Sequence, residues 1–224
     1  MRRLSQQQGQ PPGSLPLFLP GPVGCGPVSP ADGPDVRQLS SRVVYQDRWL
    51  TLRRDEIEYR DGSRGSYAVV DKPDFALVIP AQEGPGGGRF CLVEEFRYPL
   101  QRRAWAFPQG SFPDRGTGDP AGLARLELAQ ETGLRAAVLT PLGFLNCAHG
   151  LTGQGFHAFL ATGLTQGATD REPEEQDMRH GWVTRAEFTD MIRSGAICDD
   201  ATVAAFALLL LQEQAGQRQA PAGR

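Results

Sequence analysis

The sequence predicts an α/β fold, in which a mixed β-sheet is packed between helices as an α/β/α sandwich, preceded by a small N-terminal antiparallel β-sheet. Two observations lead to this class. Short segments of strand-forming residues recur between residues 42 and 183, and segments with clear helix start and stop signals lie between and after them. No internal repeat with a period of roughly 20–50 residues is present, so a repeat architecture is not expected.

The first 34 residues differ in composition from the rest of the chain. They contain eight Pro and six Gly and show no steady hydrophobic period. Such a segment cannot bury enough apolar surface to offset the loss of chain entropy, so we expect residues 1–38 to be disordered. Arg2 and Arg3 precede Leu15–Pro20 in the order found in targeting peptides, but prolines interrupt the apolar run that a signal peptide requires.

Residues 39–72 are expected to form the small N-terminal sheet. A tight turn is predicted at Asp61-Gly62, a pair of residues that favours hairpins. The strands are predicted, from their short runs of β-branched and aromatic residues, at Arg42–Tyr45, Leu50–Arg53, Glu56–Tyr59 and Ser66–Val70.

Residues 73–214 are expected to form the main domain, followed by a disordered C-terminus over 215–224. The Gly-rich run at residues 84–88 lacks the Lys-Ser/Thr pair and the following helix of a phosphate loop, so it indicates a hairpin turn. Strands are predicted at Phe75–Ile79, Arg89–Glu94, Val138–Phe144, Gly155–Ala161 and Gly181–Val183.

Two helices are predicted in the last quarter of the chain. Thr184 is the expected N-cap of a helix over Arg185–Arg193, and Glu187 completes a capping box. Asp199 or Asp200 can cap the last helix, over Ala201–Gln214, whose nearly all-apolar surface indicates that it is packed.

A third helix carries two carboxylates one turn apart. Asp119 followed by Pro120 is a strong helix start, and Gly133 is a good C-terminal stop. Between them Glu127 and Glu131 are four residues apart, so their side chains share one face. Two like charges there repel each other, whereas Mg²⁺ or Mn²⁺ would turn them into ligands because hard cations prefer carboxylate oxygens. The alternative interpretation is a solvated acidic helix face.

The stretch from Gly110 to Leu134 resembles a degenerate Nudix box, whose pattern is G-x5-E-x7-R-E-U-x-E-E-x-G-U, with U a bulky aliphatic residue. Glu127 and Glu131 occupy two Glu positions of the pattern. Leu126 stands at the Arg position, Gln130 stands at the first Glu of the E-E pair, and the loop is two residues longer.

The resemblance extends over roughly residues 40–213 and is to ADP-ribose and ADP-sugar pyrophosphatases. Phe96–Pro99 and Trp105–Gly110 are similar to their "Q-x-R-Y-P" and "W-E-L-P-A-G" segments, and Met191–Ala205 resembles their terminal "I-x-x-G-x-I-x-D-A-x-T-x-A-A" segment. Ala106 and Gln154 stand at or near positions where the family often has Glu. The sequence "F-P-Q-G" also occurs in relatives that cleave dinucleoside polyphosphates, so that substrate class stays open.

The resemblance implies a metal-dependent hydrolase that cleaves the pyrophosphate bond of a nucleoside diphosphate linked to another moiety. Mg²⁺, or Mn²⁺, is the expected cofactor, and a nucleotide is the expected small-molecule substrate. The implied metal ligands are the Glu127 and Glu131 carboxylates, a backbone carbonyl of Gln109 or Gly110, and the amide of Gln130.

The resemblance also implies residues for substrate binding and catalysis. Arg97 matches a position that clamps the diphosphate, and Gly110 and Trp105 are the further candidate substrate contacts, although for Trp105 packing in the core is the favoured interpretation. The general base is expected in the acidic loop at residues 172–177. The candidates there are Glu174 and Glu175, with Glu172 as the third.

A second function class stays open, because a Nudix fold that has lost turnover can serve as a nucleotide-binding or regulatory module. Leu126 and Gln130 are the features that favour it. Leu126 removes the Arg that ordinarily orients a neighbouring Glu, and Gln130 lacks the charge of the Glu that it replaces.

Net charge, hydropathy and cysteine spacing argue against several classes of partner and ligand. A formal net charge of −3 argues against a nucleic-acid surface, and no apolar run approaches the ~20 residues of a membrane span. We expect a cytoplasmic homodimer, because in the family the N-terminal sheet mediates dimer formation. The cysteines and histidines lack zinc-site spacing, so we expect reduced thiols and incidental imidazoles at Cys25, Cys91, Cys147, Cys198, His149, His157 and His180.

Overall fold

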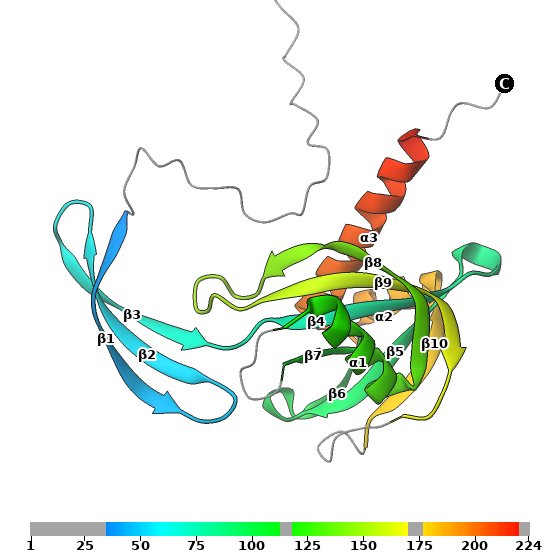
Figure 1. Cartoon of the computed structure of the whole chain (residues 1–224), viewed down its shortest axis with the longest axis horizontal. Coiled ribbons are helices and arrows are strands. Elements are labelled where there is room, and N and C mark those ends of the chain that lie inside the picture. The colour runs from blue at the N-terminus through cyan, green and yellow to red at the C-terminus, as the bar shows by residue number, and fades with distance from the viewer. Residues whose placement is uncertain (1–34, 113–117, 170–176, 220–224) are drawn as a thin grey trace, which may run out of the picture.

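The computed structural model describes residues 35–112, 118–169 and 177–219. These residues form two separate β-sheets and three α-helices (Figure 1). The smaller sheet is antiparallel and contains β1 (Val36–Gln46), β2 (Thr51–Tyr59) and β3 (Arg64–Asp71), with β2 in the centre. The predicted α/β class with a separate N-terminal antiparallel sheet is therefore confirmed.

The larger sheet is mixed and has seven strands. Its order is β10-β5-β4-β9-β8, with β6 paired to β5 and β7 paired to β4. The β4–β9 pair is parallel, and the other pairs are antiparallel. The strands are β4 (Phe75–Gln82), β5 (Arg89–Arg97), β6 (Arg102–Ala106), β7 (Gln109–Ser111), β8 (Leu134–Asn146), β9 (Gly155–Gln166) and β10 (Arg179–Thr184).

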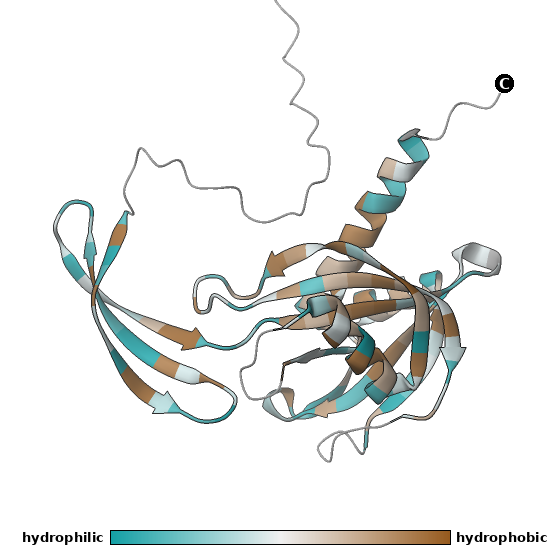
Figure 2. Ribbon diagram, viewed as in Figure 1, coloured by the Kyte–Doolittle hydropathy of each residue, from teal (hydrophilic) through white to brown (hydrophobic). Residues whose placement is uncertain are grey.

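Helices cover both faces of the larger sheet. Helix α1 (Pro120–Thr132) lies on the face seen from the front in Figure 1, and α2 (Arg185–Ser194) and α3 (Asp200–Gln219) lie behind the sheet. Alternate residues of β4 point to opposite faces. Ala76 therefore packs with the core under α1, and Leu77 packs with the core under α2 and α3. Figure 2 shows hydrophobic residues gathered on these strands, as the predicted sandwich requires.

The predicted caps of α1 and α2 are confirmed. The Asp119 carboxylate accepts hydrogen bonds from the backbone N–H groups of Ala121 (3.1 Å) and Gly122 (2.9 Å), and Gly133 ends α1 with a φ of 74°. Thr184 and Glu187 form the expected capping box at the start of α2. Local sequence therefore determines where the helix with the two carboxylates begins and ends.

The predicted hairpin turn at residues 84–88 is also confirmed, because it joins β4 to β5 through the antiparallel pair Gln82–Arg89. Gly88 has a φ of 83°, and a Cβ there would lie 2.4 Å from the backbone oxygen of Gln82. Glycine is required at this position by both the backbone conformation and the space.

Several element ends differ from those predicted. Strand β1 begins at Val36, inside the region expected to be disordered, because Val36 pairs with Tyr59 of β2. Strand β8 begins at Leu134, and α3 continues to Gln219. The two strands predicted at residues 50–59 are the single strand β2, and the short strands β6 and β7 were not predicted. Pairing to a neighbouring strand, which composition does not reveal, decides most of these ends.

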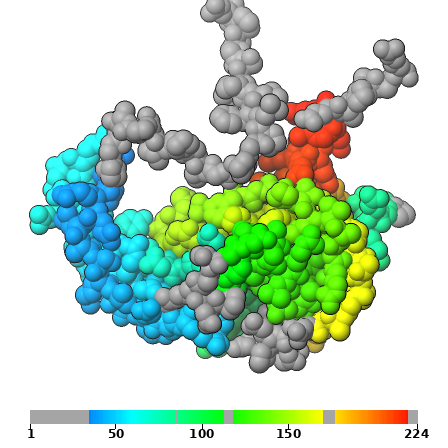
Figure 3. Space-filling view, in the orientation of Figure 1, coloured from blue at the N-terminus to red at the C-terminus, as the bar shows by residue number. Residues whose placement is uncertain are grey.

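The N-terminal sheet is attached to the main domain through the loop between β8 and β9. The Tyr67 hydroxyl donates to the backbone oxygen of Gly150 (2.9 Å), and the Val70 N–H donates to that of Leu151 (3.0 Å). Gln154 donates its amide to the backbone oxygen of Pro73 (2.6 Å). Figure 3 shows the result, in which the sheet lies beside the body and α1 forms part of the visible surface.

No helix in the described part of the chain is long and apolar enough to cross a membrane.

Candidate active site

The two carboxylates of α1 are removed from water. Glu127 is 8% exposed and Glu131 is 3% exposed, and both lie on one face of the helix. The Glu127 carboxyl group lies directly against strand β7, because a Cβ built on Gly110 would be 2.3 Å from its Cδ and 2.4–2.5 Å from its oxygens. Only glycine at position 110 leaves space for this carboxylate beside the strand.

The donor set fits a divalent cation that prefers oxygen. Mg²⁺ is commonly bound through one or two carboxylates, with waters and substrate phosphates completing its coordination. Glu127 and Glu131 are such a pair, and Gln109 and Gly110 supply backbone carbonyls on the adjacent strand. Within the described ranges, no group of three or more His, Cys, Asp or Glu could hold a metal.

The two amides near the carboxylates are placed differently. Gln130 is half-buried on α1, one residue before Glu131. The side-chain amide of Gln109 donates to the Asp199 carboxylate at 3.3 Å, toward the start of α3. For Gln109, the backbone carbonyl is therefore the oxygen to consider as a metal ligand.

Arg97 lies on the face of β5 that carries α1. Cys91 belongs to the core under α1, while Phe90 and Leu92 belong to the core under α2 and α3. Since alternate residues of a strand point to opposite faces, Glu95 and Arg97 share the face of Cys91. The structure thus places Arg97 on the same side of the sheet as the α1 carboxylates.

Arg97 forms an ion pair with Glu95. Burial raises the pKa of the Glu95 carboxyl group, the Arg97 guanidinium opposes this shift, and the Asp177 carboxylate adds to it. The Glu95 side chain is 22% exposed and that of Arg97 is 43% exposed. The guanidinium is therefore within reach of a ligand from solvent.

Trp105 lies away from this group. It is paired with Glu94 in the β5–β6 ladder and packs against the core under α2 and α3. Its backbone N–H donates to the backbone oxygen of Ala196 (3.1 Å), just after α2. The position supports the alternative role of Trp105 in the core and gives no support to its expected contact with the substrate.

The three base candidates Glu174, Glu175 and Glu172 lie outside the described residues. Asp177, the first described residue after them, is bound by Arg103, which donates to its carboxylate (2.6 Å) and to its backbone oxygen (2.9 Å).

The same guanidinium of Arg103 donates to the carboxylate (2.9 Å) and the backbone oxygen (3.0 Å) of Glu94. Arg103 therefore holds the chain at residue 177 against β5 and β6. Sequence reasoning missed this residue, and adjacent arginines at positions 102 and 103 carried no signal that separated their roles.

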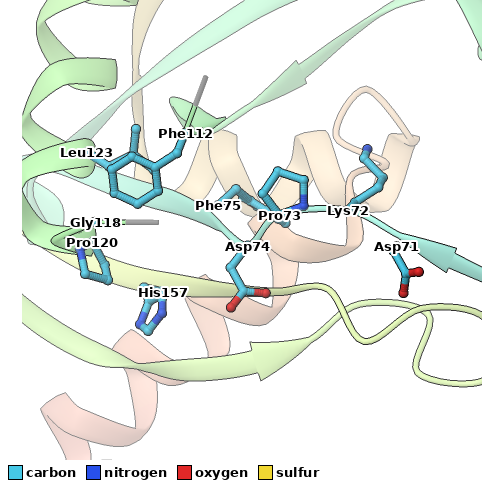
Figure 4. A pocket seen from close by; sticks show the side chains of 10 residues that line it. All are labelled: Asp71, Lys72, Pro73, Asp74, Phe75, Phe112, Gly118, Pro120, Leu123 and His157. Atoms are coloured by element: carbon cyan, nitrogen blue, oxygen red, sulfur yellow. The ribbon is translucent and has the colours of Figure 1, made fainter. Parts of the chain in front are cut away.

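A cavity of about 310 Å³ opens beside the N-terminal end of α1 (Figure 4). Leu123 on its wall precedes Glu127 by one helical turn, about 6 Å along the axis. Apolar and polar groups both face this space, as is typical of small-molecule sites. They include Phe75, Phe112 and Leu123, and Asp74, Lys72 and His157.

Comparison with known proteins connects the N-terminal sheet to a family. Residues 36–70, which span β1, β2 and most of β3, match the family model of the nucleoside diphosphate sugar hydrolase N-terminal domain. Among solved structures, the chain resembles an ADP compounds hydrolase with a TM-score of 0.69 at 18% identity, covering 83% of this chain and 97% of that one.

Three curated relatives match most of the chain. The CMP-5'-(N-acetyl-N-hydroxy-3-aminopropyl)phosphonate hydrolase of Streptomyces rubellomurinus is 29% identical over 182 residues, 80% of this chain and 84% of the relative. The ADP-ribose pyrophosphatase of Bacillus subtilis is 25% identical over 178 residues, and the methanol dehydrogenase activator of Bacillus methanolicus is 26% identical over 180 residues. Each of these two matches covers 79% of this chain and 94% of the relative.

The fold is therefore that of the ADP compounds hydrolase that the chain resembles, with a small antiparallel sheet and a larger mixed sheet. In sequence the chain is similar to nucleoside diphosphate sugar hydrolases in its N-terminal sheet and to an ADP-ribose pyrophosphatase over most of its length, as the resemblance to Nudix pyrophosphatases indicated.

The close contact between Gly110 and Glu127 yields a prediction. The Gly110→Ala substitution should destabilise the protein by about 1–3 kcal/mol, because the added Cβ overlaps the buried Glu127 carboxyl group and forces it out of its place beside β7. Gly153→Ala is the matched control, since a Cβ there meets nothing within 4 Å and should change stability by less than about 0.5 kcal/mol. Urea unfolding of both variants measures the difference, and equal values would show that the Glu127 side chain adjusts without cost.

Proposed function

We propose that the protein hydrolyses the pyrophosphate bond of a nucleoside diphosphate linked to another moiety, of the ADP-ribose or ADP-sugar class, with a divalent metal ion. The observation that carries this proposal is the pair of buried carboxylates on α1, Glu127 and Glu131, against the backbone of β7. Two anionic groups brought this close together in a poorly solvated place favour the binding of a cation.

The residues of the site have distinct roles in this reaction. Glu127 and Glu131 would hold the metal ion, with a backbone carbonyl of Gln109 or Gly110 and the amide of Gln130. When bound, a divalent ion neutralises charge on phosphate oxygens and lowers the pKa of water. Mg²⁺ and Mn²⁺ both suit such an oxygen-rich site.

Other residues would bind the substrate and activate the attacking water. The Arg97 guanidinium donates to the diphosphate oxygens, for which its planar set of N–H donors is well suited. Glu174 or Glu175, with Glu172 as the third candidate, would take the proton from the attacking water. The attachment of Asp177 to Arg103 supports this assignment, because Asp177 is two residues from Glu175 and is held at β5.

The cavity beside α1 supports a substrate with a bulky group on the diphosphate. It lies beside the first turns of α1, the helix that carries Glu127. Phe75 and Phe112 offer apolar surface, and Asp74 and His157 offer hydrogen-bonding groups. The hydrolases named among the relatives also favour a nucleotide linked to a second moiety. A dinucleoside polyphosphate is the alternative substrate.

We place this activity in the cytoplasm, without a nucleic-acid or membrane partner. The free thiols of Cys91, Cys147 and Cys198 support a reducing compartment. The net charge of −3 argues against a nucleic-acid partner.

The metal requirement is testable by hydrolysis of ADP-ribose. Wild-type turnover should need millimolar Mg²⁺ or micromolar Mn²⁺ and stop in chelator, and Glu131→Gln should abolish it because a buried ligand loses its charge. Phosphate release in the presence of an added phosphatase measures the reaction. Glu56→Gln, on an exposed part of β2, is the control and should retain turnover. Full activity in chelator would remove the proposed mechanism.

A nucleotide-binding or regulatory module is the second candidate function. Leu126, at the position of the box Arg, is 48% exposed and so gives no support to the neighbouring Glu127. A relative named as an activator of methanol dehydrogenase also favours this candidate.

The departures from the box separate the two candidates. In an enzyme, Gln130→Glu should lower the metal concentration for half-maximal activity, because an added carboxylate strengthens the attraction for a divalent ion. Leu126→Arg alone should change little, since that side chain points to solvent. If neither variant nor the wild type hydrolyses any nucleotide diphosphate while such ligands raise the melting temperature, the module is the better description.

We also propose a homodimer formed through the N-terminal sheet. All eleven residues of β1 are exposed, including the apolar Val43, Val44 and Tyr45 at 51–54%. A long, apolar edge strand is rarely left uncovered, because its free backbone groups and side chains promote association.

Light scattering at micromolar concentration should give the mass of a dimer, with an interface above ~1,000 Å² if it is specific. Val43→Lys combined with Tyr45→Lys should shift the mass to that of a monomer, whereas removal of residues 1–34 should leave the dimer intact. A monomeric mass for the full chain would contradict the proposal.

A further inference from the structure

Two arginines of the β5–β6 hairpin are bound by carboxylates in different ways. The Arg103 guanidinium uses all three of its nitrogens in hydrogen bonds to Glu94 and Asp177. Arg97 forms one ion pair among the described residues, through Nη1 to Oε1 of Glu95. Arg103 is therefore committed to structure, whereas most of the five N–H donors of Arg97 stay available to a ligand.

The ion pair of Arg97 is oriented by the strand. Glu95 and Arg97 are two residues apart on β5, so their side chains leave the same face of the sheet, the one that carries α1. Glu95 is the more buried of the two, with 22% of its side chain exposed against 43% for Arg97. The carboxylate thus lies beneath the guanidinium and binds it from the protein side.

The ionised form of Glu95 is unfavourable without a cationic partner, because its carboxylate is largely removed from water. Burial raises the pKa of Glu95 and the nearby Asp177 adds to the effect, whereas Arg97 and, to a smaller extent, Arg103 lower it, so the charged form is stabilised chiefly by Arg97. The same dependence restricts Arg97, because moving the guanidinium away would leave a poorly solvated anion without its counter-charge.

We propose that Glu95 is a positioning residue, which holds Arg97 so that its remaining N–H donors face the diphosphate. This inference rests on the proposed function and adds to it a residue outside the metal site. A guanidinium that is fixed before the substrate arrives loses less conformational freedom on binding, and the binding of the diphosphate is stronger by that amount.

The test is a double-mutant cycle with Glu95→Ala, Arg97→Ala and both together. Glu95→Ala should raise KM for ADP-ribose about tenfold, the effect of about one charge-assisted hydrogen bond, with kcat changed much less. Because Glu95 acts through Arg97, it should have no further effect in the Arg97→Ala background. Glu95→Gln keeps an acceptor oxygen and should recover most of the loss.

A matched control is available in the N-terminal sheet. Arg54 and Glu56 form an ion pair with the same two-residue spacing on β2, at 3.7 Å and with both side chains more than half exposed. Glu56→Ala should leave KM unchanged. Melting temperatures of all variants show whether a change in KM reflects unfolding.

Binding without turnover separates this inference from the proposed function. Calorimetry with the non-hydrolysable α,β-methylene analogue of ADP-ribose should show that Glu95→Ala raises Kd about tenfold. In the Arg97→Ala background the same substitution should leave Kd unchanged. Absence of wild-type hydrolysis would overturn the proposed function, while this calorimetric result would still support the role of Glu95. Equal Kd values for wild type and Glu95→Ala, or equal losses in both backgrounds, would overturn the inference.

Discussion

The contact between α1 and the strand before it is the constraint on which the rest of the site depends. The apolar side of α1, with Leu123, Ala124 and Leu128, packs on the larger sheet and fixes the rotation of the helix about its axis. That rotation turns Glu127 toward β7, where only the missing Cβ of Gly110 makes room for its carboxyl group. Hydrophobic packing thus holds two like charges together on one face of the helix, where water reaches them poorly.

The N-terminal sheet is connected to the cavity beside α1 through the segment that joins β3 to β4. Gln154, at the end of the loop between β8 and β9, binds the backbone of Pro73, and the N–H of Gly155, the first residue of β9, donates to the carboxylate of Asp74 (2.7 Å). Asp74 and Phe75 then line the cavity beside α1. Gln154 therefore holds the chain whose next residues, Asp74 and Phe75, form part of the cavity wall.

Local signals were sufficient for the starts of the predicted helices and for the end of α1, but they did not reveal which face of the sheet each strand residue occupies. Asp119, Pro120 and Gly133 define α1 by interactions within a few residues, so the spacing of Glu127 and Glu131 could be read directly from the sequence. The placement of Trp105 could not, because its face follows from the register of β6 against β5. Glu95 escaped notice for a related reason: its burial depends on the sheet and its neighbours, and the motif around Arg97 draws attention to the arginine alone.

The carboxylates of Glu94, Glu95 and Asp177 lie near the end of β5 and bind two different arginines. Glu94 and Asp177 are bound by Arg103, an arrangement that fixes the chain at residue 177. Glu95, next in sequence to Glu94, points to the other face and binds Arg97. A single strand thus separates a structural ion-pair network from one that faces the proposed diphosphate site. Asp177 belongs to both networks, because it accepts hydrogen bonds from Arg103 and its carboxylate adds to the raised pKa of Glu95.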